Sequence, residues 1–272
     1  MIGCGGRIQV GDTVKLRIAL CIGMLFVSSG HGQEKPARLT FEVAAIRPTP
    51  PDARYGGIKP MPAGDGYLVQ NMAVKTMISL MYKVPGRQIK GGPDWLDSSR
   101  WDIEAKADHY YNIDDLHTMF QNLLADRFNL KFHIETKEGP VYALMVDKSG
   151  SKMKINDSAQ DFKIPILPGP DNVFVGTRVP MKYFCWFLSN QVTADERPVI
   201  DRTGLGDKNY DFTLSFVPEL PPNVPKENLP PGLLDRPSLF DALKEQLGLK
   251  LQPEKGPVEY YVIDHVEKPS EN

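Results

Sequence analysis

The chain has 272 residues, of which 41% are hydrophobic, 24% charged and 9% aromatic, and its formal net charge is −2. This composition excludes a disordered acidic tail, a collagen-like repeat and a membrane protein with several spans. The near-neutral charge also argues against a nucleic-acid-binding protein, which normally carries a concentrated basic surface. A chain of this length corresponds to one large domain or to two of ordinary size.

Residues 1–32 have the order of an export signal. Lys15 and Arg17 precede an uncharged apolar run over residues 18–27, and small residues follow it. As a helix this run extends about 15 Å, half of a hydrocarbon core of about 30 Å. We therefore expect a cleaved signal peptide, a secreted or periplasmic protein and no permanent membrane anchor. The alternative is a buried N-terminal helix.

Export also determines which cysteines remain. Cleavage after Gly32 removes Cys4 and Cys21 and leaves Cys185 as the single cysteine of the mature chain. One thiol cannot form a disulfide within its own chain, so the mature protein must rely on its hydrophobic core. Because Cys185 lies in an apolar stretch and thiolate chemistry needs a polar, electropositive setting, we expect a buried and inert thiol.

The most informative feature of the sequence is an internal repeat. Residues 137–147 and 254–264 both contain Gly-Pro-Val and both end in aspartate. We expect each segment to form a tight turn followed by a short strand, so that each repeat is closed by its own Gly-Pro-Val hairpin.

An amphipathic helix is predicted before each of these segments. Apolar residues recur at helical spacing over residues 116–128 and again over 239–247. Ser238 is a suitable cap for the start of the second helix. Asn129 and Gly248 follow the two helices and suit the left-handed conformation that ends a helix.

Further matches extend the repeat toward the N-terminus. Two compact apolar helices are predicted over residues 74–81 and 181–188, and two alternating strands over 101–105 and 210–214. Residues 41–46 add an opening strand. The sequence thus predicts an α+β fold of two tandem pseudo-repeats, each a small mixed or antiparallel sheet packed by amphipathic helices.

The predicted repeats occupy residues 38–147 and 173–267. Residues 148–172 begin with Lys-Ser-Gly-Ser-Lys and are expected to join them. Residues 218–237 contain seven prolines, which exclude a regular helix or a central strand. We expect an exposed loop there, within the second repeat.

Several short motifs are spread over nearly the whole mature chain. They are Phe41-Glu-Val-Ala, Gly91–Asp97, Leu123–Phe128, Asp201–Gly204, Tyr210–Phe212 and Gly256–Val266. Together they resemble the soil-associated protein family, an uncharacterised group of exported proteins from soil bacteria. The resemblance implies secretion but supplies no activity and no catalytic residues. Related domains form extracytoplasmic tails on membrane metallopeptidases similar to beta-lactam sensors, which implies sensing or docking.

A second similarity concerns the fold alone. An amphipathic helix that ends in Gly-Leu before a strand hairpin resembles the small N-terminal domain of secretin and TonB proteins. This similarity favours a binding module. The sequence departs from the soil-associated pattern in the helix around Cys185 and in the long proline-rich loop.

Five residues are candidates for ligand binding. Trp95 and Tyr110 are aromatic residues suited to stacking on a sugar or peptide. Asp201 is placed to order a turn through backbone amides, and Arg202 offers a guanidinium group to a carboxylate. Arg100 lies near the corresponding place in the first repeat. The alternatives are partly packed aromatic rings and a structural turn with a surface ion pair.

No metal, cofactor or catalytic residue is predicted. His133 and Glu135 share one strand face, but a zinc site needs three or four converging ligands. The sequence contains no Gly-x-Ser-x-Gly nucleophile elbow and no phosphate-binding loop.

The sequence therefore predicts an exported, non-enzymatic module that binds a protein, a peptide or a glycan of the cell envelope, and no nucleic acid. Strand edges between the repeats are natural docking sites. The alternatives are a secreted hydrolase whose acidic and histidine residues meet only in the fold, and a sensor domain for a membrane partner. A pocket that joins Asp201, a histidine and a second carboxylate would favour the hydrolase.

Overall fold

The computed structural model describes residues 38–269 except 171–172, 193–196, 220–228 and 230. The predicted signal peptide with Cys4 and Cys21, and part of the proline-rich loop, therefore lie outside the described residues. Residues Arg38–Asn272 form one compact unit. Within the described ranges, no helix combines the length and the hydropathy needed to span a bilayer.

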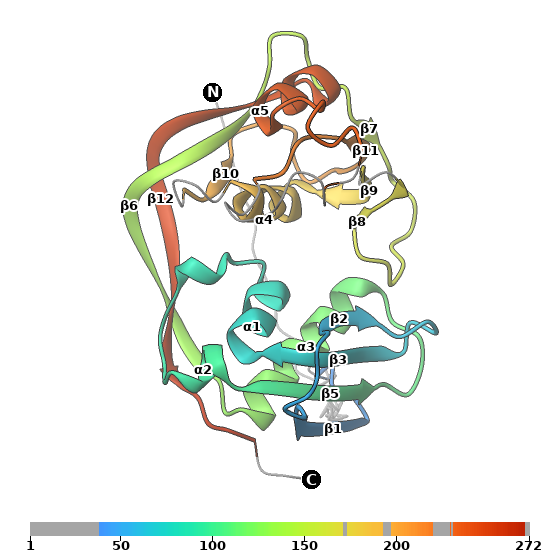
Figure 1. The fold of residues 1–272 in the computed structure, drawn as a ribbon, viewed down its shortest axis with the longest axis vertical. Helices are drawn as coiled ribbons and strands as arrows, with labels where there is room; N and C mark the ends of the chain where they lie inside the picture. The colour runs from blue at the N-terminus through green and yellow to red at the C-terminus, as the bar shows by residue number, and fades with distance from the viewer. Residues whose placement is uncertain (1–37, 171–172, 193–196, 220–228, 230, 270–272) are drawn as a thin grey trace, which may run out of the picture. The chain divides into compact units, whose positions relative to one another are not determined.

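The fold is mixed α+β, as predicted, and its first sheet is antiparallel (Figure 1). Helices α1 (Val74–Tyr82) and α3 (Ile113–Arg127) share a hydrophobic core with this sheet. The short helices η1 (Gly86–Gln88) and α2 (Trp95–Ser98) follow α1 in the chain. In spatial order the strands are β1 (Val43–Pro48), β5 (Arg100–Lys106), β3 (Gly66–Ala73) and β2 (Gly57–Pro60).

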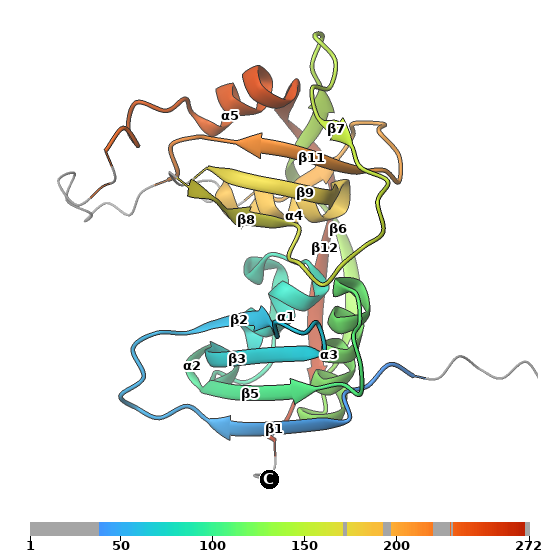
Figure 2. The same ribbon diagram turned by 90° about the vertical axis from the view of Figure 1, so that its right-hand side faces the viewer.

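A second antiparallel sheet lies in the other half of the described chain, and Figure 2 shows the strands of both sheets in front of their helices. Its core includes residues of α4 (Met181–Gln191), α5 (Leu239–Ala242) and the π-helical turn η4 (Leu243–Leu247). Two of its strands, β7 and β8, come from the predicted joint 148–172. In spatial order the strands are β7 (Lys154–Ile155), β11 (Asn209–Leu214), β9 (Phe174–Pro180) and β8 (Ile166–Pro168).

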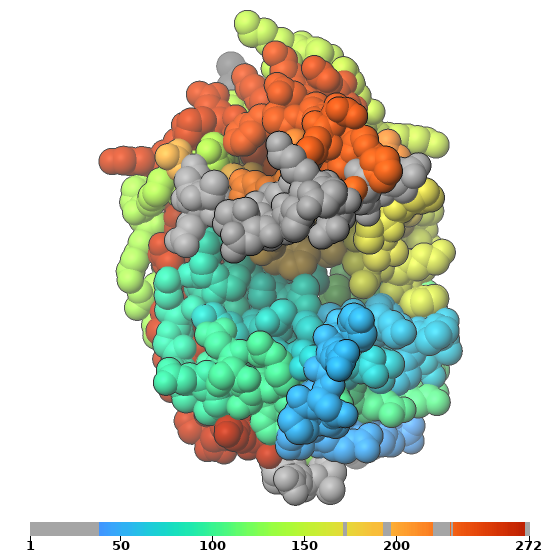
Figure 3. Space-filling view, viewed as in Figure 1, coloured from blue at the N-terminus to red at the C-terminus, as the bar shows by residue number. Residues whose placement is uncertain are grey.

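The third sheet is built on a long two-stranded ribbon. Strands β6 (Lys131–Val146) and β12 (Leu249–His265) pair antiparallel over nearly their whole length. The ribbon runs alongside both other sheets, at the left of Figures 1 and 3. Two short strands pair parallel with it, β10 (Val199–Asp201) with β6 and β4 (Ile89–Gly91) with β12.

The predicted Gly-Pro-Val hairpins are wrong. Each Gly-Pro-Val lies inside a continuous strand, and the two copies pair with each other, with Gly139 opposite Gly256. Neither glycine has a positive φ. A Cβ on Gly139 would lie 3.1 Å from a Val258 methyl carbon, and one on Gly256 would lie 3.1 Å from methyl carbons of Ile200 and Val141. The glycines therefore allow close packing on the ribbon and do not form turns.

The ribbon supplies residues to both cores. Tyr261 and Ile263, near the end of β12, belong to the core of the first sheet. Leu249 and Leu251, at the start of the same strand, belong to the core of the second. The chain therefore does not divide into two self-contained units, and the repeat itself stays a prediction.

The predicted helix ends are confirmed. Asn129, after α3, has φ 51°, and Gly248, after η4, has φ 66°. The Ser238 side chain accepts a hydrogen bond from the Asp241 backbone N–H at the start of α5, as expected of a cap.

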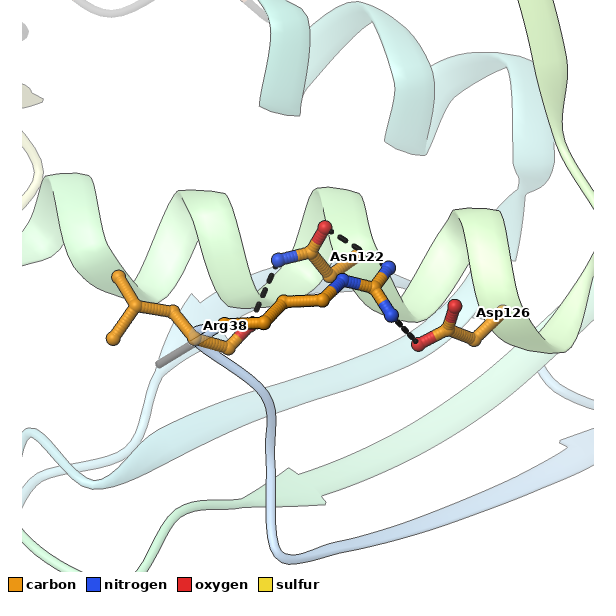
Figure 4. A network of polar contacts seen from close by, with 4 residues as sticks. Arg38, Asn122 and Asp126 are labelled. Atoms are coloured by element: carbon orange, nitrogen blue, oxygen red, sulfur yellow. Dashed lines mark hydrogen bonds and ion pairs between the residues drawn. The ribbon is translucent and has the colours of Figure 1, made fainter. Parts of the chain in front are cut away.

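The beginning of the described chain is tied to α3. The Arg38 guanidinium donates to Asp126 Oδ2 at 2.9 Å and to Asn122 Oδ1 at 3.1 Å, and Asn122 Nδ2 donates to the Leu39 carbonyl at 2.8 Å (Figure 4). These contacts fix the segment that leads into β1.

Gly204 and Gly248 have the same φ but different surroundings. Replacing each by alanine therefore distinguishes the cost of backbone strain from the cost of steric overlap. Gly248 and Gly204 both have φ 66°, but a Cβ on Gly248 would lie 1.9 Å from the Gly150 carbonyl oxygen, whereas one on Gly204 would meet nothing within 4 Å. We expect Gly204→Ala to lower the free energy of unfolding by about 1 kcal/mol and Gly248→Ala by about 3 kcal/mol or more. Urea denaturation measures both, and equal losses would contradict the steric account.

Candidate functional site

A cavity of about 330 Å³ lies between the two cores, next to the ribbon. Its size is at the lower end of the range for small-ligand sites. Four parts of the fold form its walls: the chain from the end of α1 through η1, helix α4, strand β10 with the residue before it, and the middle of β12. The lining residues are Lys83, Val84, Pro85, Gln88, Lys182, Cys185, Trp186, Ser189, Pro198, Val199, Ile200, Asp201, Pro257, Glu259 and Tyr261.

A buried hydrogen-bond network holds these walls together. The Ser189 hydroxyl donates to the Cys185 carbonyl at 2.7 Å and accepts from the Val199 N–H at 2.8 Å, which connects α4 to β10. The Arg87 guanidinium donates to the carbonyls of Ser189 and Arg197 at 3.0 and 2.9 Å. These two bonds connect η1 to α4 and to the segment that leads into β10. Together, the bonds of Ser189 and Arg87 connect three of the four walls to one another.

Gln88 connects η1 to the ribbon. Its Nε2 donates to the Glu259 carbonyl at 2.6 Å, and the residue is 7% exposed. Its Oε1 is buried and has no hydrogen-bond partner, and the same is true of Trp186 Nε1 on α4. A buried polar atom without a partner costs about 1–3 kcal/mol.

Lys83 joins the first half of the chain to α4. It follows α1 with φ 55°, and its Nζ donates to the Leu80 carbonyl. The same Nζ is 3.3 Å from His117 Nε2 on α3 and lies 5.3 and 5.2 Å from the ring centroids of Tyr183 and Trp186. The ammonium group therefore combines a helix C-terminal contact with two cation–π contacts.

Desolvation determines the protonation of Lys83 and His117. Burial lowers the pKa of Lys83 to about 7, against a smaller opposing effect of Asp114. Burial, together with the Lys83 charge, lowers the pKa of His117 to about 3. His117 is therefore neutral at physiological pH, and in the tautomer that carries its proton on Nδ1 its Nε2 accepts a hydrogen bond from Lys83 Nζ.

The acidic groups of the cavity do not form a hydrolase site with a histidine. Asp201 and Glu259 line the cavity and are exposed, but no histidine is among the lining residues. Cys185 is 6% exposed, and burial, with a smaller effect of Asp201, raises the pKa of its thiol to about 12. In the part of the chain that is described, no group of three or more His, Cys, Asp or Glu side chains is placed to hold a metal ion.

Of the five predicted ligand-binding residues, Asp201 is the one that lines this cavity. Its Oδ1 accepts from the Thr203 backbone N–H at 2.8 Å and from the Thr203 hydroxyl at 2.7 Å, so it orders the turn as expected. Arg202 lies beside it, with Nε 3.5 Å from Glu254 Oε1.

The other three candidates lie apart from the cavity lining. Trp95 is half-buried against the first core, with Lys268 Nζ 6.0 Å from its ring centroid. The Arg100 guanidinium donates to the Asp97 carbonyl. Tyr110 is 49% exposed and meets Phe162 edge to face.

Sequence reasoning missed Lys83, Gln88 and Trp186. Lys83 and Gln88 follow a predicted helix in a stretch without a motif, and Trp186 lies in a helix whose apolar pattern predicts only burial. The contacts that bring them to the cavity, Lys83 with Trp186 and Gln88 with Glu259, join residues about a hundred or more positions apart. No local pattern could have found them.

Fold and cavity together define an α+β protein with a ligand-sized site between two cores that share one ribbon. A family model described as "Protein of unknown function (DUF3738)" matches residues 75–266, and the chain belongs to this family. The matched range contains every residue that lines the cavity. No curated protein and no solved structure matches the chain.

Lys83 should make the protein more stable as the pH rises from 7 to 9. Its pKa is about 7 in the folded protein against an ordinary value of 10.5, so the unfolded chain binds more protons over this range and the free energy of unfolding rises with pH. The rise is about 2 kcal/mol. Urea denaturation at each pH measures it, and Lys83→Met should abolish it.

Lys182→Met is the matched control, because Lys182 lines the same cavity but is exposed. The rise should persist in this variant. The measured range ends at pH 9 because of Tyr82. Burial raises the pKa of Tyr82 to about 12, so at higher pH its ionisation in the unfolded chain lowers the free energy of unfolding. If the free energy of unfolding of Lys83→Met rises with pH as much as that of the unaltered chain, the lowered pKa of Lys83 is not the cause.

Cys185 should resist alkylation. With a pKa of about 12 in place of 9.0, its thiolate fraction at pH 8 is about a thousandfold lower than that of an ordinary cysteine. Iodoacetamide treatment of the full chain, followed by peptide mass spectrometry, should leave Cys185 unmodified in buffer and modify it in urea. Equal rates under the two conditions would show that the thiol is accessible and activated.

Proposed function

We propose that this protein is an exported, non-enzymatic module that binds a protein, peptide or glycan of the cell envelope, and that the cavity between its cores receives the ligand. The observation that carries this proposal is the composition of the cavity. Its walls are mainly apolar and aromatic, and a few polar and charged groups face a space of ligand size. This combination is typical of binding sites.

The side chains of the cavity favour binding over catalysis. Acyl transfer by a hydrolase needs an activated nucleophile next to a base. Burial keeps Cys185 protonated, and the lining carboxylates have no histidine beside them in the cavity. Walls that are hydrogen-bonded to one another and carry aromatic surface suit recognition, because little backbone freedom is lost when a ligand binds.

The proposed location rests on the sequence. The order of charged, apolar and small residues over 1–32 supports export to the periplasm or the medium. The motifs that resemble the soil-associated family point the same way. A sensor domain for a membrane partner would use the same cavity and would differ in what the occupied protein contacts.

Blocking the cavity tests the proposal. Ile200→Trp puts a large side chain into the lining, and Lys182→Trp does so by changing an exposed residue of α4. The full chain and both variants are screened by calorimetry against short peptides and envelope oligosaccharides. We expect the unaltered chain to bind a member of one class and each variant to bind it at least about tenfold more weakly, about 1.4 kcal/mol.

Ile155→Trp is the control, because Ile155 is an exposed isoleucine of β7 outside the cavity. It should bind like the unaltered chain. Circular dichroism confirms that each variant is folded. Absence of binding in both ligand classes would refute the proposed function, and turnover of a bound ligand would show that the protein is an enzyme.

A further inference from the structure

We propose that the ligand of the cavity is a short peptide, and that one of its backbone amides is held between Gln88 and Trp186. This inference rests on the proposed function and adds the class of ligand. It follows from the two unpartnered polar atoms, from the hydrogen bond between Gln88 and the ribbon, and from the bonding or exposure of the other polar groups in the walls.

The unpartnered atoms are concentrated at the cavity. Among the described residues, four buried side-chain polar atoms have no hydrogen-bond partner, and two of them belong to residues that line this cavity. One is an acceptor, Gln88 Oε1, and the other is a donor, Trp186 Nε1. A ligand that supplies one N–H and one carbonyl oxygen would satisfy both atoms.

A hydrogen bond to the ribbon occupies the nitrogen of the Gln88 side-chain amide. Strand β4 pairs with Tyr261–Ile263 of β12, and just before this pairing the Gln88 side chain donates to the Glu259 carbonyl at 2.6 Å. Because the side-chain amide is planar, anchoring Nε2 on the ribbon leaves Oε1 as the end available to another group. Gln88 therefore has one amide atom bonded to the ribbon and one left for a ligand.

A trans peptide unit has the donor and the acceptor that the two atoms lack. Its N–H and its carbonyl point in opposite directions across one plane, so one unit can donate to Gln88 Oε1 on η1 and accept from Trp186 Nε1 on α4. Both atoms are covered in this structure. Binding therefore requires the Trp186 ring and the groups that cover Gln88 Oε1 to move, while Gln88 Nε2 keeps its bond to the ribbon. The movement at Trp186 gives the site a spectroscopic signal.

The remaining walls favour a peptide over a glycan. Prolines, Ile200 and Tyr261 offer apolar surface for short side chains. Of the other polar lining side chains, Lys83 and Ser189 already bond within the protein, and the remaining three are exposed. A sugar carries several hydroxyl groups, and those away from the exposed side chains would lose hydration without a matching polar group. The charged lining residues include both signs, so the cavity does not select an anion or a cation.

The test begins with the full chain and an equimolar mixture of N-acetylated, C-amidated tripeptides with varied side chains. Peptides that co-purify are identified by mass spectrometry and titrated singly, with the tryptophan indole N–H signals followed by NMR. The chain has three tryptophans, so the signals are few. We expect the Trp186 signal to move downfield on binding and the Trp95 signal to stay in place.

Matched variants and a modified ligand examine the two hydrogen bonds. Gln88→Met and Trp186→Phe should each weaken binding between about three- and tenfold, since each removes one bond. Gln121→Met and Trp95→Phe are the controls and should leave binding unchanged. Gln121 also donates its amide to a backbone carbonyl, that of Met81 at 2.9 Å, but it lies outside the cavity. Replacing the bound amide N–H of the peptide by an ester oxygen should weaken binding as much as Gln88→Met does.

The outcomes separate this inference from the proposed function. If no tripeptide binds and an oligosaccharide binds in a way that Ile200→Trp abolishes, the cavity is a binding site and the peptide assignment is wrong. The assignment is also wrong if peptides bind but neither Gln88→Met nor Trp186→Phe weakens them. If neither class binds, the proposed function fails as well.

Discussion

The antiparallel pairing of β6 with β12 is the constraint on which the rest of the structure depends. Each core is completed by residues from this ribbon, such as Leu249 at one end of β12 and Ile263 near the other. The ribbon also positions β4 and β10, its two parallel neighbours. Because the cavity lies where η1, α4 and β10 meet the middle of β12, its walls exist only while this pairing is intact.

The individual elements of the fold could be predicted from the sequence because their signals are local. Helical spacing identified α1, α3 and α4, alternation identified β5 and β11, and the left-handed residues Asn129 and Gly248 ended two helices as expected. The Gly-Pro-Val segments could not be predicted correctly. A glycine–proline pair is a turn signal in isolation, and its use inside a strand depends on a partner more than a hundred residues away.

The candidate site was less predictable for the same reason. Asp201 carries a local signal, since its side chain bonds the turn that follows it, and it is the predicted residue that lines the cavity. Lys83 and Gln88 acquire their chemistry only through tertiary neighbours. Lys83 lies against the rings of Tyr183 and Trp186, and Gln88 bonds the Glu259 backbone. Burial and orphaned hydrogen-bonding atoms are properties of the assembled fold, and composition or spacing does not encode them.

The shared ribbon also has a consequence for biosynthesis. Tyr261 and Ile263 belong to the core that is otherwise built from the first half of the chain. That core therefore stays incomplete until the C-terminal strand has been synthesised, and contacts of such long sequence separation form slowly. The growing polypeptide must carry exposed apolar surface through most of its translation. Under the export proposed above, this delay would be an advantage, because an unfolded chain is the form that a translocation channel accepts.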